Sequence, residues 1–256
     1  MKLEFLRLAE TIISLQGNKP VVYVSFDGNW GDALIRVGTI NFFRHFNIDY
    51  TVINHQTSSL DRNKILLSAK LNNQLVVIAG GGAWCGHYQH ASNLTQKLQS
   101  RFKFNKVLVL PSTFDKHYDI PNTIFFRRDI LNSKEVMPKA YFCHDMAFFL
   151  APLEVTGKPT QKEANFFRTD VEKSGKIKVP DNNLDLSVQG TVLSDAFSFF
   201  EKLSDYEQIN TDRLHVAIGG SILNKQVNLQ AGSYFKNYAI FKSSIEPFYP
   251  NTQFIE

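Results

Sequence analysis

The chain of 256 residues is long enough for one large domain or two modest domains, each with its own hydrophobic core. Its 43% hydrophobic and 20% charged residues are typical of a globular protein, and its 22 phenylalanines indicate thick apolar layers between sheets and helices. The formal net charge of +4 suits small anionic ligands but is too small to favour nucleic acid. The two cysteines, Cys85 and Cys143, exclude a disulfide framework and favour a reducing compartment.

The segment at residues 1–16 has the spacing of an amphipathic helix. Leu3, Leu6 and Ile13 alternate with charged residues, which differs from the continuous apolar core of a signal peptide. No apolar run approaches the roughly 20 residues that are needed to cross a bilayer. We therefore expect a cytoplasmic protein whose first helix packs on the first lobe. Docking of the protein at the inner face of the membrane is the alternative that the pattern leaves open.

Between residues 21 and 143, short apolar runs alternate with amphipathic stretches. The apolar runs suit strands buried on both faces of a parallel sheet, and they lie at 21–26, 50–53, 75–79 and 107–110. Helices are expected between them at 32–46, 62–71 and 90–102, and shorter strands follow at 123–126 and 140–143. This order of strands and helices is typical of a doubly wound α/β lobe.

A second lobe is expected after 152–161, where two prolines and a glycine are typical of a linker. Strands are expected at 165–168, 208–211 and 226–229, helices at 192–203, 213–223 and from 233, and a loop at 173–188. The sequence thus predicts an α/β fold of two Rossmann-like lobes with parallel sheets, one at 1–152 and the other at 160–256. The cleft between two such lobes is the expected ligand site.

The first predicted strand leads into the turn Asp27-Gly28-Asn29-Trp30-Gly31-Asp32 and then into a helix. Glycines let the backbone approach a ligand, and a helix N-terminus offers N–H groups and a partial positive charge. Asn29 or Asp32 can cap this helix. Spacing alone leaves two interpretations equally open: a site for an anionic or hydroxyl-bearing ligand, or a tight capped turn.

Three consecutive glycines, Gly80-Gly81-Gly82, follow the strand that is expected at 75–79. A loop without side chains lets another group press against bare backbone amides. A flexible turn is the simpler interpretation, but three glycines together reduce the order of a compact lobe. The triplet therefore favours the close approach of a ligand.

The string Thr211-Asp212-Arg213-Leu214-His215 is expected where a strand of the second lobe meets a helix. Thr211 or Asp212 can cap that helix, while Arg213 and His215 project from its first turn. A guanidinium group matches carboxylate or phosphate oxygens, and an imidazole can hold or release a proton near neutral pH. For isolated residues, a cap followed by a surface arginine is the more common outcome.

Other charged residues near strand ends have structural interpretations. Arg168 is as well suited to a salt bridge with Asp170 or Glu172 as to a ligand in the cleft. The string Arg127-Arg128-Asp129 suggests a solvated charge cluster that caps the next helix. Asp145 suits a buried carboxylate that organises a loop better than a catalyst.

No metal and no organic cofactor is expected. Cys85, His87 and His90 lie close together, but no carboxylate or further histidine at a suitable spacing accompanies them. The glycine-containing turn at 27–32 does not have the GxGxxG spacing of dinucleotide-binding proteins.

Taken in order, these segments resemble the polysaccharide pyruvyl transferase family. The resemblance spans about residues 21–236, and the string at 211–215 is its most specific part. The matching segments are Gly28-Asn29-Trp30-Gly31-Asp32-Ala33-Leu34-Ile35, Gly80-Gly81-Gly82, Leu110-Pro111-Ser112, Arg128-Asp129, Asp145-Met146-Ala147-Phe148, Arg168-Thr169-Asp170-Val171-Glu172, Thr211-Asp212-Arg213-Leu214-His215 and Gly232-Ser233-Tyr234-Phe235-Lys236. The chain departs from the family at Ser112, where glutamine is usual, and at His144, where proline is frequent.

The resemblance implies a fold related to the GT-B glycosyltransferases and phosphoenolpyruvate as the donor substrate. It implies a product in which pyruvate bridges two hydroxyls of one sugar as a ketal, in a surface or secreted polysaccharide. The acceptor is then a sugar, and a lipid-linked oligosaccharide is one form that it can take.

The resemblance also implies roles for single residues. His215 and Arg213 become the catalytic candidates, the first for proton transfer and the second in the donor site. Arg168 becomes a second anion-binding arginine of the C-terminal lobe, the expected donor side. The remaining candidates for substrate binding are Asn29, Gly31, Asp32, Gly80, Gly81, Gly82, Asp212, Ser233 and Lys236, of which those in the N-terminal lobe are assigned to the acceptor side.

Two other classes of function stay open at this point. A nucleotide-sugar glycosyltransferase of the GT-B type shares two lobes and an anion-binding helix. A non-catalytic protein that binds a carbohydrate or a partner can retain the same fold.

Overall fold

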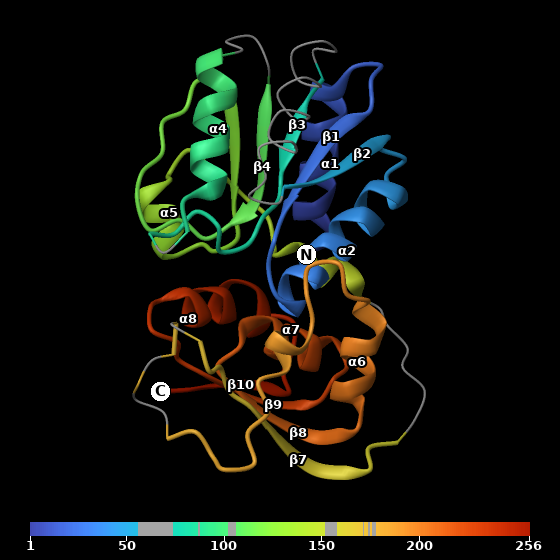
Figure 1. The fold of residues 1–256 in the computed structure, drawn as a ribbon, viewed down its shortest axis with the longest axis vertical. Coiled ribbons are helices and arrows are strands. Elements are labelled where there is room, and N and C mark those ends of the chain that lie inside the picture. Colours follow the sequence, from blue (N-terminus) through green and yellow to red (C-terminus); the bar gives the residue numbers. More distant parts are fainter. Residues whose placement is uncertain are drawn as a thin grey trace. The chain divides into compact units, whose positions relative to one another are not determined.

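The computed structural model describes residues 1–55, 74–86, 88–101, 106–151, 158–170, 172–173, 175 and 178–256. The chain divides into two compact units, each built on a parallel sheet (Figure 1). Unit 1 consists of Met1–Asp27 and Thr39–Met146, and unit 2 consists of Gly28–Gly38 and Ala147–Glu256. The predicted α/β class with two Rossmann-like lobes is confirmed.

The sheet of unit 1 has six parallel strands in the order β2-β1-β3-β4-β5-β6. They are β1 (Val21–Phe26), β2 (Tyr50–His55), β3 (Val76–Ile78), β4 (Val107–Ser112), β5 (Thr123–Arg127) and β6 (Tyr141–Phe142). Every residue of β1, β3 and β4 is buried, as expected for parallel strands that are covered on both faces. The apolar runs in the sequence therefore predicted these strands correctly.

The helices that include residues of unit 1 are α1 (Lys2–Gln16), α2 (Trp30–His45), α4 (His90–Arg101) and α5 (Asn132–Val136). Helix α1 buries four apolar residues spaced by three or four positions, and its Phe5 ring lies 6.2 Å from the ring of Phe42 in α2. The predicted N-terminal helix is thus confirmed, whereas the helix expected at 62–71 lies outside the described residues. In the described ranges no helix is long and apolar enough to cross a membrane.

Charged residues that follow β5 are buried and paired. Arg128 donates from Nη1 to Asp145 and from Nε to the hydroxyl of Thr113 at 2.8 Å. Asp129 accepts two backbone N–H groups at the start of α5, at 3.1 and 2.9 Å. The expectation of a solvated charge cluster here is wrong, because the charges are compensated inside the unit. Asp129 is not the N-cap residue of α5, which is Leu131, but it accepts these N–H groups from the start of the helix. Asp145 is buried, as predicted, and pairs with Arg128.

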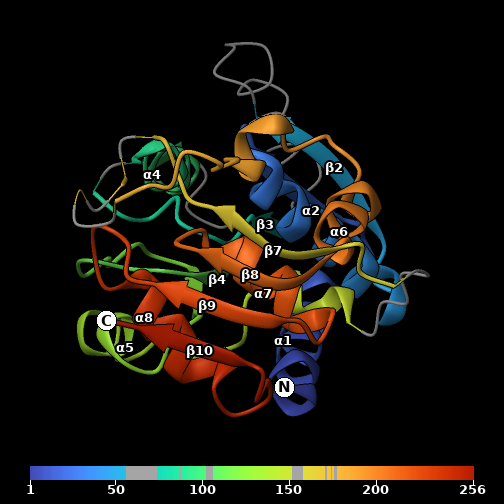
Figure 2. The ribbon, with the colours of Figure 1, turned by 90° about the horizontal axis from the view of Figure 1, so that it is seen from below.

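The sheet of unit 2 has four parallel strands in the order β10-β9-β8-β7, which lie side by side in Figure 2. They are β7 (Gln161–Phe166), β8 (Tyr206–Thr211), β9 (Gln226–Gln230) and β10 (Thr252–Ile255). The sequence did not predict β10, and it placed the start of β7 four residues too late. Both are edge strands with several exposed positions, so their polar residues obscure the apolar pattern.

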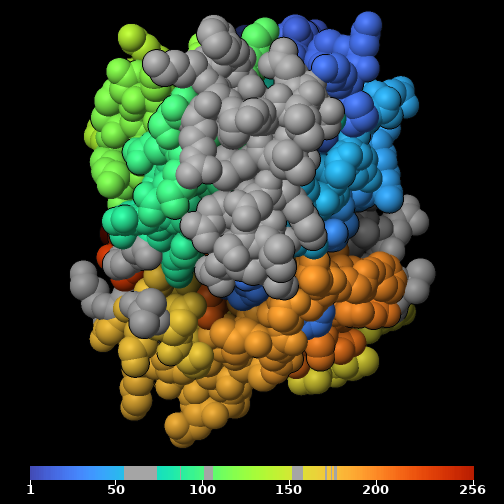
Figure 3. Space-filling model, turned by 45° about the horizontal axis from the view of Figure 1, so that its top comes forward, coloured from blue at the N-terminus to red at the C-terminus, as the bar shows by residue number. Residues whose placement is uncertain are grey.

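The helices of unit 2 follow its strands closely. They are α6 (Ala196–Ser204), α7 (Leu214–Ile222) and α8 (Lys236–Ile240), with the short 3-10 helices η1 (Met146–Leu150) and η2 (Leu186–Gln189) and the π-helix η3 (Phe241–Ile245). Helix α6 starts later than expected, because Asp195 caps it by accepting the N–H of Ser198 at 2.7 Å. Figure 3 shows part of the surface of unit 2 in gold and orange.

The segment Gly28–Gly38 belongs to unit 2 although it follows the first strand of unit 1. The indole N–H of Trp30 donates to the carbonyl of Asp195 at 2.8 Å, and its ring packs edge-on against Phe199 at 5.4 Å. The sequence placed all of 1–152 in the first lobe. The compact units differ from that expectation here, because the buried Trp30 side chain anchors the start of α2 in the core of unit 2.

His144 is a buried histidine of unit 1. Its ring contacts Phe5 and Phe142, and its Nε2 lies 3.5 Å from the carboxylate of Glu4. Burial and the nearby N-terminal amine lower the pKa of His144 to about 4, although Glu4 opposes this shift. The unfolded chain binds this proton near pH 6.5, so unfolding takes up a proton between these two values.

We therefore expect acidification to weaken the fold through His144. The contribution of His144 is intact above pH 6.5, and it should be reduced by about 2 kcal/mol at pH 5, because the unfolded state is then protonated and the folded state is not. Urea unfolding at pH 7, 6 and 5 measures this loss, with His144→Gln as the non-titrating control. An identical pH dependence in both proteins would contradict the prediction.

Candidate functional site

Three basic side chains follow neighbouring strands of the unit 2 sheet, of which Arg168 and Arg213 are buried and Lys236 is 12% exposed. Arg168 follows β7, Arg213 follows β8, and Lys236 begins α8 after β9. The carboxyl ends of parallel strands share one edge of the sheet, and open α/β folds bind ligands at this edge. We define the arginine cluster as these three residues together with the carboxylates of Asp170, Glu172 and Asp185.

Two carboxylates hold the guanidinium group of Arg213. Its Nε and Nη2 donate to the two carboxylate oxygens of Asp185 at 2.9 and 2.6 Å, while Nη1 lies 2.8 Å from Oδ2 of Asp170. Asp185 also accepts the N–H and the hydroxyl of Thr169 at 2.7 and 2.9 Å. The side chains of Arg213 and Asp185 are each only 4% exposed. Their bidentate contact therefore compensates two charges that have lost their hydration.

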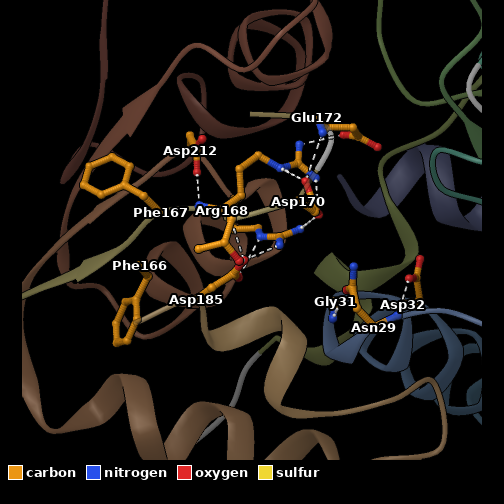
Figure 4. A network of polar contacts seen from close by, with 12 residues as sticks. Asn29, Gly31, Asp32, Phe166, Phe167, Arg168, Asp170, Glu172, Asp185 and Asp212 are labelled. Carbon is orange, nitrogen blue, oxygen red and sulfur yellow. Dashed lines mark hydrogen bonds and ion pairs between the residues drawn. The ribbon is translucent and has the colours of Figure 1, made fainter. Parts of the chain in front are cut away.

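Arg168 is held in a similar way (Figure 4). Its Nε and Nη2 donate to the two oxygens of Asp170 at 2.9 and 3.3 Å, and Nη1 donates to Glu172 at 2.6 Å. Its backbone N–H donates to Oδ1 of Asp212 at 2.8 Å. Of the partners that the sequence left open, Arg168 thus pairs with both Asp170 and Glu172. The pair with Glu172 is buried, since Arg168 is 6% and Glu172 5% exposed, whereas Asp170 is 32% exposed.

Lys236 joins the cluster through Glu172. Its Nζ donates to Oε2 of Glu172 at 2.9 Å, the same oxygen that accepts from Arg168. The ammonium group also lies 4.9 Å from the centre of the Tyr234 ring, within the range of a cation–π contact. Glu172 therefore links the loop after β7 to the start of α8.

The charges of the cluster stabilise one another. Burial lowers the pKa of Arg168, but Glu172 and Asp170 outweigh this effect and raise the pKa above its ordinary value. Burial raises the pKa of Asp170, but Arg168 and Arg213 outweigh it and lower the pKa. Burial also raises the pKa of Asp212, and its contacts with Arg168 offset this only in part. Three formal positive charges thus face the three carboxylates that define the cluster.

The imidazole of His215 packs against the start of α2. A Cβ atom added at Gly31 would overlap Nδ1 of His215, so the close approach requires glycine at this position. The N–H of Gly31 donates to the side chain of Asn29 at 2.8 Å, and the N–H of Asn29 donates to Asp32 at 2.9 Å. These reciprocal bonds form a capping-box arrangement, which confirms the predicted capping role of Asn29 and Asp32.

The start of α7 differs from the predicted capped junction. Arg213 is the N-cap residue, and no side chain caps the helix. The hydroxyl of Thr211 instead accepts the N–H of Arg213 at 2.9 Å and donates to the carbonyl of Phe166 at 2.7 Å. The predicted caps Thr211 and Asp212 are therefore wrong, because both side chains connect β8 to the end of β7. The positive end of the α7 dipole is left without a side-chain cap.

The glycine triplet lies in unit 1, after β3. A Cβ atom at Gly80 would overlap the carbonyl of Pro111. Gly81 has a φ of 104°, donates to the same carbonyl and accepts the N–H of Thr113, both at 3.0 Å. These two glycines thus allow a close approach of β4. A Cβ atom at Gly82 would meet nothing within 4 Å among the described residues, so the binding role of Gly82 stays a prediction.

The structure brings most candidate residues into two groups of unit 2. Arg168, Asp212, Arg213 and Lys236 are linked by the contacts of the arginine cluster, whereas Asn29, Gly31 and Asp32 lie at the helix start that packs on His215. Ser233 is exposed in the loop before α8. That the triplet Gly80-Gly81-Gly82 faces these groups stays a prediction, and His87 lies outside the described residues.

Sequence reasoning missed the anionic half of the cluster. Asp170 and Glu172 follow Arg168 by two and four residues, a spacing that suggested a salt bridge but not a buried network. Asp185 lies in a loop 17 residues after Arg168, and no local pattern marks it as a partner of Arg213. Only the fold brings these side chains together.

Replacement of Gly80 by alanine should destabilise unit 1. The added methyl group would press on rigid backbone at Pro111, so we expect a loss of about 2 kcal/mol in the free energy of unfolding. Gly82→Ala is the matched control, since its methyl group would contact none of the residues that the structure describes and should change stability by less than about 0.5 kcal/mol. Urea unfolding of both variants checks this, and equal losses would contradict it.

Neutralising Asp185 should destabilise unit 2. Asp185→Asn leaves the buried Arg213 without its bidentate carboxylate, and breaking a buried ion pair costs about 3 kcal/mol or more. Denaturant unfolding measures the effect against Asp181→Asn, which removes the charge of an exposed loop carboxylate. The prediction is wrong if both variants are as stable as the unaltered protein.

Comparison with known proteins agrees with this architecture, although no family model matches the sequence. The chain is 24% identical over 292 aligned residues to a Bacillus subtilis (strain 168) protein named "Putative pyruvyl transferase EpsO", and the alignment covers 92% of this chain and 88% of that protein. It is also similar to the crystal structure of an uncharacterized protein from Klebsiella pneumoniae subsp. pneumoniae, with a TM-score of 0.78, 27% sequence identity and full coverage of both chains. The chain therefore shares its fold with a solved structure and is distantly similar, over nearly its whole length, to a protein named as a pyruvyl transferase.

Proposed function

We propose that this chain transfers the pyruvyl group of phosphoenolpyruvate to two hydroxyls of one sugar and forms a cyclic ketal. The observation that carries the proposal is the arginine cluster at the carboxyl edge of the unit 2 sheet, with His215 on the first turn of the helix that Arg213 begins. The name of the Bacillus subtilis relative and the segments that resemble pyruvyl transferases support the same chemistry.

The donor carries a carboxylate and a phosphate, so its site needs at least two sets of matched hydrogen-bond donors. In our proposal Arg168 and Arg213 offer planar guanidinium groups, and Lys236 offers a compact ammonium group. The uncapped start of α7 adds backbone N–H groups and a partial positive charge. Such groups also stabilise the negative charge that develops on a departing phosphate.

The proposed reaction proceeds in two additions at the central carbon of phosphoenolpyruvate. A proton is added to the methylene carbon, which becomes a methyl group, while the first sugar hydroxyl bonds to the central carbon and loses its proton. The bond from this carbon to the phosphate oxygen then breaks, and its electron pair leaves with phosphate. The second hydroxyl closes the ring and releases its proton. The products are the ketal and inorganic phosphate, so no oxidant or reductant enters the balance.

His215 is our candidate for moving these protons. An imidazole can accept a proton from the attacking hydroxyl and return one to the methylene carbon near neutral pH. The ring packs on Gly31, next to the side chain of Asn29. We therefore assign Asn29 and Asp32 to the side on which the sugar binds.

Replacement of His215 by alanine should abolish most turnover and leave the fold intact. Loss of a general acid–base group lowers rates by about 10²- to 10⁴-fold. Phosphate release from phosphoenolpyruvate is measured with a panel of β-galactosides, glucosides and N-acetylated hexosamines, free and lipid-linked. The exposed histidine His45, replaced by alanine, is the matched control.

Two results would overturn this assignment. A His215→Ala protein with the unaltered rate would remove His215 from the reaction. Consumption of a nucleotide sugar in place of phosphoenolpyruvate would identify a glycosyltransferase, and the absence of both reactions with every acceptor would favour a carbohydrate-binding protein.

A further inference from the structure

Asp170 has a different position in the arginine cluster from the other two carboxylates. It forms a bidentate pair with Arg168 and also contacts Nη1 of Arg213 at 2.8 Å. Asp170 thus contacts both guanidinium groups of the cluster. Asp170 therefore occupies the point where the hydrogen-bonding edges of the two arginines converge.

The other two carboxylates are fixed by additional partners. Asp185 is 4% exposed and accepts two hydrogen bonds from Thr169, and Glu172 is 5% exposed and shared with Lys236. The Asp170 side chain is 32% exposed, and beyond the arginines it accepts the backbone N–H of Glu172 at 3.1 Å. Of the three, Asp170 is the carboxylate that solvent reaches and that a dissolved anion can replace.

The charges of the cluster favour such a replacement over simple addition. Three basic side chains already face the three carboxylates of the cluster, and Asp212 adds a fourth carboxylate beside Arg168. A ligand with several negative charges would therefore meet no net attraction and would be repelled by Asp170 at close range. A ligand carboxylate has the same planar, two-oxygen geometry as Asp170 and can form the same bidentate contacts with Arg168. Displacement of Asp170 leaves both arginines available to the ligand without a new buried charge imbalance.

We propose that Asp170 is an internal counter-ion that an anionic ligand displaces from Arg168 and Arg213. The ligand is a small molecule with a carboxylate, a phosphate or both. The inference rests on the proposed function only where this ligand is identified as phosphoenolpyruvate. Asp170 then acts as a specificity-determining residue: it competes with singly charged anions, and a ligand with two anionic groups that contact both arginines displaces it.

The test is a binding titration without a sugar acceptor. Calorimetry measures the affinity of phosphoenolpyruvate, inorganic phosphate and pyruvate for the unaltered protein and for Asp170→Asn, which keeps the shape of the side chain and removes its charge. We expect phosphoenolpyruvate to bind at least about tenfold more tightly to the variant, and phosphate and pyruvate to gain affinity by a larger factor, so that the preference for phosphoenolpyruvate over these two anions narrows. Asp181→Asn, at an exposed position of the same unit, should leave all three affinities unchanged.

Equal or weaker binding to a folded Asp170→Asn protein would overturn the proposal, because Asp170 would then hold the arginines in place for the ligand. If circular dichroism shows that Asp170→Asn is unfolded, the titrations are repeated with Asp170→Ser, which also removes the charge. The displacement of Asp170 and the transfer of pyruvyl can each be rejected without the other. Tighter anion binding without ketal formation would support the displacement and reject pyruvyl transfer, whereas ketal formation without tighter binding would do the reverse.

Discussion

Two guanidinium groups buried at one sheet edge impose the main constraint on unit 2. A buried charge is tolerated only beside an opposite charge, and Arg168 and Arg213 therefore require the carboxylates that surround them. These contacts connect the loop after β7, the loop before η2, the start of α7 and, through Lys236, the start of α8. In our proposal, the contacts that stabilise the fold also hold both arginines in place for an anion, which displaces Asp170, the most exposed carboxylate of the cluster.

The start of α2 gives this site a component from the N-terminal third of the chain. Trp30 is buried among residues of unit 2, and Gly31 lets the ring of His215 pack directly on the helix start. A continuous helix therefore contributes residues to both compact units. The Asn29 and Asp32 side chains close the turn by capping it, so their positions are determined before any ligand binds.

Fold and function are supported by different observations in this protein. Two Rossmann-like lobes host many chemistries, so the similarity to a Klebsiella pneumoniae structure supports the architecture alone. The proposal of pyruvyl transfer depends instead on the charges of the site and on a distant relative named for that activity. An arginine pair suits a carboxylate and a phosphate, and an imidazole on the adjacent helix suits a reaction that moves protons without a redox change.

The sequence by itself determined the α/β class and most strands and helices of both lobes, because fully buried strands such as β1 and β4 are continuous apolar runs and parallel strands need helical connections. It also marked Arg168, Arg213 and His215 as candidates, since they follow strand ends or open a helix. Only the tertiary structure decided what these residues contact. Asp185 pairs with Arg213 across 28 residues, and Gly31 meets His215 across 184, because contacts between distant segments are set by packing and leave no local periodicity.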